Sequence, residues 1–174
     1  MSTTDVAART SAKEQILEAY EEAHAKTMRV LNAFPADKAD MRPHPRCKNA
    51  RELAFTFVME RGLGAKVFHD GLATGGAPGK PPEPPQSWSD ILSAIEQSHR
   101  EFGDLVRSTP DDQMNETVKF FTGPKTMGDV RRIDFLRFLV DDEIHHRGQF
   151  SVYLRMAEGK VPSIYGPSGD EPWS

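Results

Sequence analysis

Four segments with helical periodicity, each followed by residues that end helices, constrain the fold of this chain more than any other feature. Apolar residues recur every three or four positions over residues 12–34, 49–70, 87–110 and 129–158. A proline cannot donate the next helical hydrogen bond, and glycine favours the backbone turn that closes a helix. The pattern therefore predicts an all-α protein, a bundle of four amphipathic helices. The residues at or just beyond the segment ends are Pro35, Gly71, Pro110 and Gly159.

The stretches between these segments are expected to be connectors within a single domain that covers residues 1–174. The Pro/Gly-rich loop 73–86 cannot sustain regular structure, because proline removes hydrogen-bond donors and glycine adds backbone entropy. Neither side of this loop would hold a complete core, so we expect it to cross one end of the bundle. A short extended piece is expected at 117–122, and residues 1–11 and 162–174 are expected to be terminal extensions.

Composition and charge favour a cytoplasmic protein without a nucleic-acid or membrane partner. A formal net charge of −4 argues against the basic surface that nucleic-acid binding requires. No apolar run approaches the roughly 20 residues that span a bilayer, so we expect no membrane partner. Residues 1–12 are polar and small, without a secretory apolar core. Cys47 is the only cysteine, which excludes an internal disulfide and fits a reducing compartment.

The candidate functional residues form a polar run within the last helical segment. Asp142, His145, His146 and Gln149 lie within about one third of a turn of one another on a helix, at roughly 100° per residue. Apolar residues precede and follow them on the same stripe, which predicts that these polar groups face the interior. A buried carboxylate or imidazole costs several kcal/mol unless it is paired or bound to a metal. The i, i+4 spacing of Asp142 and His146 suits two ligands of one divalent metal. The alternatives are an internal hydrogen-bonded pair or a solvated helix face.

Glu60 is the candidate third ligand, because it interrupts an apolar stripe between Leu53 and Val67 on the second helical segment. Glutamate, aspartate and histidine together bind zinc, nickel, iron or manganese, and such a set leans toward the harder metals. In the alternative interpretation, Glu60 pairs with Arg61, with Arg147 or with a neighbouring helix, or lies at the edge of the stripe.

The other histidines and the cysteine carry weaker signals. His24 and His99 lie in charged stretches and are expected to be solvated. Cys47, beside Arg46 and Lys48, would be a somewhat activated thiol, but no other residue supports a nucleophilic role.

Several motifs in the chain resemble the DinB/YfiT-like superfamily. The resemblance covers nearly the whole chain, and a His-His-Arg-Gly-Gln run within a helix bundle is fairly specific for it. Early in the chain the motifs are Arg-Pro-His-Pro at 42–45 and Ala-Arg-Glu-Leu-Ala at 50–54. Later they are Asp-Glu-Ile-His-His-Arg-Gly-Gln at 142–149, Tyr-Leu-Arg at 153–155, Gly159, Val-Pro at 161–162 and Tyr-Gly-Pro-Ser at 165–168.

The resemblance implies a bundle with up-down-down-up connectivity, frequently dimeric, that holds a divalent metal through three ligands. The usual ligands are one histidine on the second helix and a His-x-x-x-His pair on the fourth. The second histidine of that pair falls on His146 and the first on Asp142, while the histidine of the second helix falls on Thr56. The triad is therefore degenerate, and Glu60, one turn beyond Thr56, is the expected substitute. The resemblance favours zinc or nickel, with iron or manganese as alternatives.

Two functional hypotheses follow. In the first, the chain is similar to the family's thiol-dependent S-transferases and hydrolases, and a low-molecular-weight thiol or water attacks a small electrophilic substrate. His145 or Gln149 would orient the reactants, and Arg147 would bind a substrate carboxylate or hold a site acid. In the second, the chain is a non-catalytic scaffold that has lost its metal and acts as a small-molecule-binding or dimerisation module. The resemblance favours a homodimer in both cases.

Overall fold

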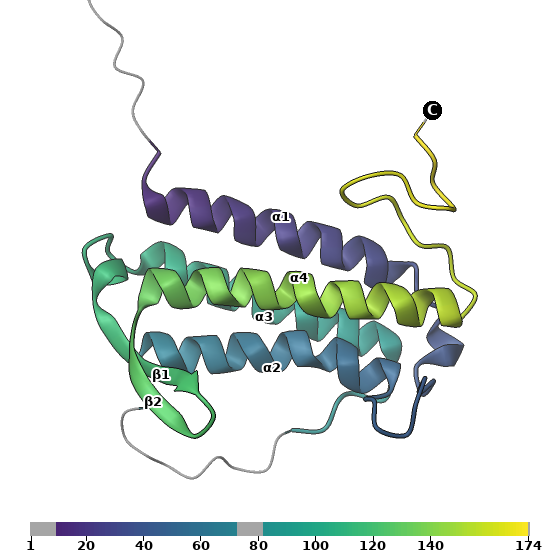
Figure 1. Ribbon diagram of the computed structural model, residues 1–174, viewed down its shortest axis with the longest axis horizontal. Helices are drawn as coiled ribbons and strands as arrows, with labels where there is room; N and C mark the ends of the chain where they lie inside the picture. Colours follow the sequence, from purple (N-terminus) through teal and green to yellow (C-terminus); the bar gives the residue numbers. More distant parts are fainter. Residues whose placement is uncertain (1–9, 73–81, 174) are drawn as a thin grey trace, which may run out of the picture.

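A computed structural model describes residues 10–72 and 82–173, and within them four long helices form a bundle (Figure 1). α1 and α4 run in one direction, and α2 and α3 run in the opposite one. The two pairs α1–α4 and α2–α3 make the most extensive helix–helix contacts, and α2 also packs against α4. The helices are α1 (Ala12–Asn32), α2 (Ala50–Phe68), α3 (Trp88–Ser108) and α4 (Arg132–Met156).

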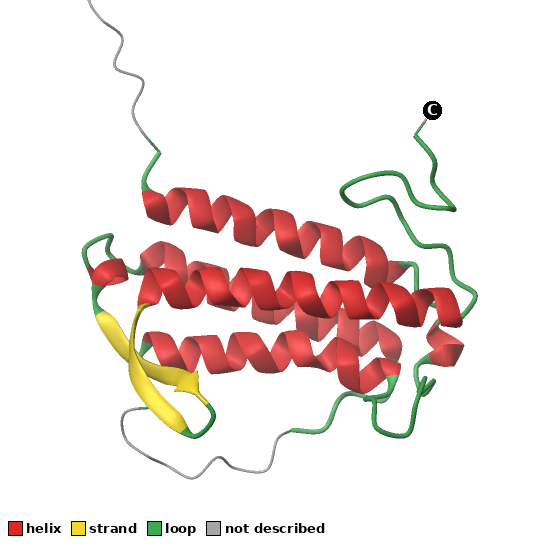
Figure 2. Cartoon of the chain, in the orientation of Figure 1, coloured by secondary structure: helices red, strands yellow, loops and turns green. Residues whose placement is uncertain are grey.

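A β-hairpin between α3 and α4 shows that the all-α assignment is wrong (Figure 2). Its strands, β1 (Thr117–Gly123) and β2 (Thr126–Arg131), pair antiparallel. The extended piece expected at 117–122 is confirmed as β1, but residues 129–131, which were expected to begin the last helix, belong to β2. Alternating burial of side chains favours a strand here, because Val118 and Phe120 are buried against the core and their neighbours are not. β2 then satisfies the backbone groups of β1.

The starts of α1, α2 and α3 are specified locally by capping residues. Asn49 accepts a hydrogen bond from the backbone N–H of Glu52, whose side chain accepts one from the backbone N–H of Asn49. This capping box fixes the start of α2 at the boundary expected from the sequence. Ser87 caps α3, and Ser11 with Glu14 forms a second capping box at the start of α1.

The core consists of two apolar clusters, one toward each end of the bundle. One contains Leu31, Trp88 and Phe150, and the other contains Phe102 and Phe135. Between them, at mid-height, each helix contributes buried polar residues in place of apolar ones. These residues are His24 and Thr27 on α1, Arg61 on α2, His99 on α3, and Glu143 and Arg147 on α4.

The chain after α4 is not helical and is held against the bundle by charged pairs. Arg155 pairs with Asp170, and Arg29 pairs with Glu171. Most of the expected 73–86 loop and of the 1–11 extension lies outside the described residues. None of the described helices is both long and apolar enough to cross a bilayer.

Candidate functional site

α2 and α4 bring Glu60, Asp142 and His146 together at mid-height of the bundle. The Nε2 atom of His146 lies 2.9 Å from Oε1 of Glu60 and 3.6 Å from Oδ1 of Asp142. One potential ligand atom from each residue lies within 4.8 Å of the other two. All three side chains are partly buried. Among the described residues this is the one group of three acidic or histidine side chains close enough to share a metal ion.

Gln149 fixes the orientation of the His146 ring. The Nδ1–H of His146 donates to Oε1 of Gln149 at 3.2 Å, and the amide of Gln149 donates to Nε2 of His145 at 2.9 Å. The remaining nitrogen, Nε2, is thereby directed at the two carboxylates. Metal-binding histidines are commonly oriented in this way, with the nitrogen that does not bind the metal donating to a neighbouring acceptor.

The electrostatics of the site favour a proton shared between His146 and Glu60. The hydrogen bond to Glu60 raises the pKa of His146 most strongly, and Gln149 and Asp142 add to the effect. Burial raises the pKa of Glu60, although the neighbouring His146 opposes this increase. Both shifts favour the protonated forms, so the pair holds a proton more firmly than the two isolated groups would. A divalent cation would replace that proton.

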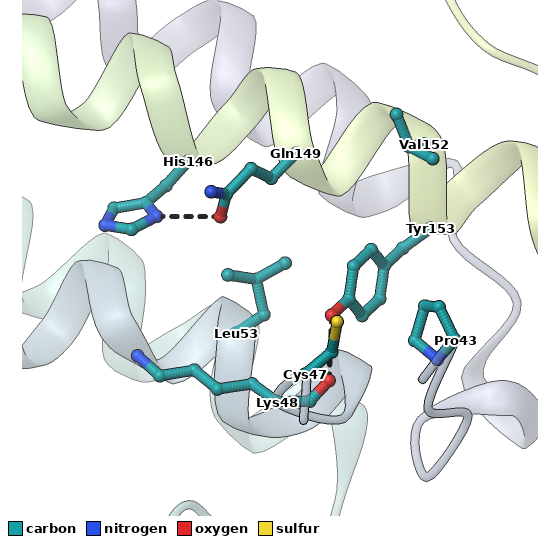
Figure 3. Close-up of a pocket in the computed structure, with 8 residues that line it drawn as sticks. All are labelled: Pro43, Cys47, Lys48, Leu53, His146, Gln149, Val152 and Tyr153. Atoms are coloured by element: carbon teal, nitrogen blue, oxygen red, sulfur yellow. Dashed lines mark hydrogen bonds between the residues drawn. The ribbon is translucent and has the colours of Figure 1, made fainter. Parts of the chain in front are cut away.

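An open cleft of about 460 Å³ adjoins His146 (Figure 3). His146 and Gln149 lie at one end and Tyr153 and Pro43 at the other. The Tyr153 hydroxyl donates to the backbone oxygen of Lys48 at 2.8 Å. The volume is within the range of small-molecule sites. Its walls are mostly apolar, and the residues that complete them are Cys47, Lys48, Leu53 and Val152.

Thr56, which occupies the position of the usual second-helix histidine, makes other contacts. Its hydroxyl accepts a hydrogen bond from Nζ of Lys48 at 2.6 Å and lies 3.2 Å from the backbone oxygen of Glu52. Glu60, one turn further along α2, is the residue that reaches His146. Of the alternative partners considered for Glu60, the structure therefore shows one on a neighbouring helix, His146 on α4, and not Arg61 or Arg147.

The structure separates the other predicted site residues. His145 and Gln149 are exposed, so the expectation that they enter the interior is wrong, although Gln149 borders the cleft. Arg147 is buried instead, where it donates to the backbone oxygen of Ala23 and to the Tyr165 hydroxyl. The suggested contact between Arg147 and a substrate carboxylate stays a prediction.

The expectation that His24 and His99 are solvated is also wrong. Both side chains are buried, and their rings stack with centroids 3.6 Å apart. Arg61 donates to Nδ1 of His24 at 3.2 Å and to Oε2 of Glu143 at 2.9 Å. A buried polar layer therefore crosses the bundle behind Glu60.

Helical spacing contained the signal for this buried layer. His99 continues the i, i+4 series of Ile91 and Ile95 on α3, and all three are buried. On α4, Glu143 stands four residues after Leu139 and seven before Phe150, which places it on an apolar stripe. The charged residues next to these positions obscured the pattern.

Comparisons with known proteins agree on one family. The model of the DinB family matches residues 1–172. The chain is 31% identical over 88 residues to the uncharacterized protein YrdA of Bacillus subtilis strain 168, which is 50% of each protein. The chain thus spans about half the length of the curated relative that it matches.

Solved structures show the same fold. A DinB-like protein from Bacillus cereus ATCC 10987 superposes with a TM-score of 0.69 at 20% identity, over 87% of this chain and 97% of that one. The DinB-like protein YjoA from Bacillus subtilis gives 0.66 at 17% identity, over 85% and 95%. A conserved protein from Enterococcus faecalis gives 0.58 at 17% identity, over 82% and 94%. Together with the family match over almost its full length, this likeness shows that the chain belongs to the DinB family.

Proposed function

We propose that this protein is a metal-dependent enzyme whose metal centre is formed by Glu60, Asp142 and His146. One observation carries the proposal: three side chains of metal-binding type converge from two helices, and one of them, His146, also lines a cleft that suits a small molecule. Two carboxylates and one imidazole fit a divalent cation, because they supply charge to neutralise it and leave coordination positions open. Zinc or nickel would be accepted, as would iron or manganese.

The reaction class that fits this arrangement is thiol-dependent S-transfer or hydrolysis of a small electrophilic substrate. Held by Glu60, Asp142 and His146, a divalent ion would lower the pKa of a bound thiol or water and so would supply a nucleophile at neutral pH. The chain's own residues orient and enclose the reactants. Gln149 holds the His146 ring in place, and the apolar wall around Leu53 and Val152 limits access of water to the substrate. Tyr153 closes the far end of the cleft.

Calorimetric titration with zinc and with nickel tests the metal centre. Loss of an outer-shell partner of a metal lowers affinity by roughly 10- to 100-fold. Because Asp142 and His146 would bind the ion directly, the Asp142→Ala and His146→Ala variants should each weaken metal binding by more than that. Asp141→Ala is the matched control, because Asp141 is exposed and is the immediate neighbour of Asp142. Wild-type affinity in both ligand variants would reject these ligands. Elemental analysis of protein purified without a metal-affinity tag would identify the native ion.

A second candidate is a non-catalytic bundle that binds a small molecule or dimerises. The contact between Glu60 and His146 favours it, because these groups satisfy one another without a metal. Thr56, which stands at the position of the usual second-helix histidine, is also engaged in a hydrogen bond with Lys48. A structural or catalytic metal should make the melting temperature sensitive to chelator. Identical melting of the native protein with and without chelator would favour this scaffold.

A further inference from the structure

A buried ion pair joins α2 to α4 directly behind the proposed metal centre. Nη2 of Arg61 lies 2.9 Å from Oε2 of Glu143, and each side chain is only 4% exposed. Arg61 also donates to Nδ1 of His24 on α1. Its guanidinium therefore contacts side chains of two other helices, α1 and α4.

The Arg61–Glu143 pair is adjacent to the proposed metal ligands both along the chain and in space. Arg61 follows Glu60 on α2, and Glu143 follows Asp142 on α4. Glu60, Arg61 and Glu143 line one internal cavity of about 10 Å³, together with Tyr20, Phe57 and Leu139. That volume holds about one water molecule at most. Glu60 therefore has little room to move independently of the pair behind it.

Stability alone does not account for this pair. The removal of two charges from water costs several kcal/mol, and apolar side chains of similar volume commonly pack as well or better. The other oxygen of Glu143, Oε1, has no hydrogen-bond partner within residues 10–72 and 82–173, which adds to the cost. A buried pair of this kind is best explained by a geometry that it imposes.

We infer that Arg61 and Glu143 are positioning residues, whose ion pair sets the separation of α2 and α4 at the height of Glu60, Asp142 and His146. The inference rests on the proposed metal centre. Glu60 reaches the site from α2 and the other two ligands reach it from α4, so the helix separation decides whether they can share one ion. Ligand atoms must lie within about 0.5 Å of the required positions, so a small change in helix separation is enough to disturb the site.

A double variant separates positioning from stability. Arg61→Met combined with Glu143→Leu replaces the pair by apolar side chains, so the metal-free protein should melt close to wild type. Its zinc affinity should fall by roughly 10- to 100-fold. The visible absorption of the cobalt-loaded protein, which reports ligand geometry directly, should change in position or intensity.

Two single variants and a control make the test complete. Glu143→Gln keeps the length of the side chain and an acceptor for Arg61. It should keep the zinc affinity within a few-fold of wild type and leave the cobalt spectrum unchanged. Glu143→Asp keeps the charge but shortens the side chain, so it should alter the cobalt spectrum, and it decides the question if the double variant does not fold. Val106→Ala, which truncates a buried side chain on α3, should lower the melting temperature but leave the spectrum unchanged.

The outcomes distinguish this inference from the proposed function. If wild type binds zinc and cobalt but the double variant and Glu143→Asp match it in affinity and spectrum, the positioning role is wrong and the metal centre stands. If wild type binds neither metal, the metal centre is overturned, and the positioning role falls with it.

Discussion

At the scale of single residues, the proton shared by His146 and Glu60 makes metal binding at this site dependent on pH. The pKa of His146 is raised, chiefly by its hydrogen bond to Glu60, so the imidazole keeps its proton above the usual pKa of about 6.5. The pair therefore contributes stability at low pH, and that contribution is lost as the pH rises through the raised pKa. A metal needs the deprotonated imidazole and so competes with this proton.

We therefore predict that zinc affinity rises as the pH increases from 6 to 8, by up to about tenfold per pH unit while one proton is displaced. Calorimetry in two buffers with different ionisation enthalpies counts the protons released for each ion bound. The Gln149→Leu variant should weaken binding, because the His146 ring would lose the acceptor that orients it. Binding without proton release across this range would contradict the shared proton.

At the scale of elements, the hairpin is stabilised by only one of its faces. Phe120 is 9% exposed and contacts the rings of Phe135 and Phe138, whereas its neighbour Phe121 is 55% exposed. Phe120→Ala should lower the free energy of unfolding by about 3 kcal/mol. Phe121→Ala, the matched control, should change it by less than about 0.5 kcal/mol. Urea denaturation measures both, and equal losses would show that β1 does not pack as described.

At the scale of the whole molecule, the buried polar layer should make the protein sensitive to acid. Burial lowers the pKa of His24 to about 4, and the neighbouring His99 and Arg61 act in the same direction. Burial likewise lowers the pKa of His99. Glu96, Glu21 and Glu143 oppose these decreases but do not outweigh them.

The sign of the effect follows from these lowered pKa values. Between about pH 6.5 and pH 4, the unfolded chain takes up protons on His24 and His99 that the folded protein does not. Stability should thus be highest above pH 6.5 and fall by on the order of 1–3 kcal/mol as the pH drops to about 4. Urea denaturation at several pH values checks this, and His99→Phe should flatten the dependence. An equally steep loss in that variant would assign the effect to other groups.

The predicted homodimer also belongs to this scale. Sedimentation of the metal-free and the zinc-loaded protein at micromolar concentration should give twice the mass of the 19.4 kDa chain. A single species of monomer mass in both states would contradict it.

The sequence by itself determined the features that depend on neighbours along the chain. The apolar periodicity, the caps at Asn49 and Ser87 and the breaks at proline and glycine specify the helices, because each acts within about one turn. The spacing of Asp142 and His146 likewise ensures that they meet, since residues four apart share a helix face.

Only the tertiary structure decided which polar side chains face inward and which strands pair. Adjacent helical residues point about 100° apart, so a modest rotation of α4 exchanges Asp142 and His146 for Glu143 and Arg147 at the centre of the bundle. That rotation is set by packing against α1 and α2, which no local pattern encodes. The same holds for β2, whose residues lack a strong pattern of their own and become a strand because β1 needs a partner. It also holds for the meeting of Glu60 with His146, which depends on the separation of two helices far apart in the chain.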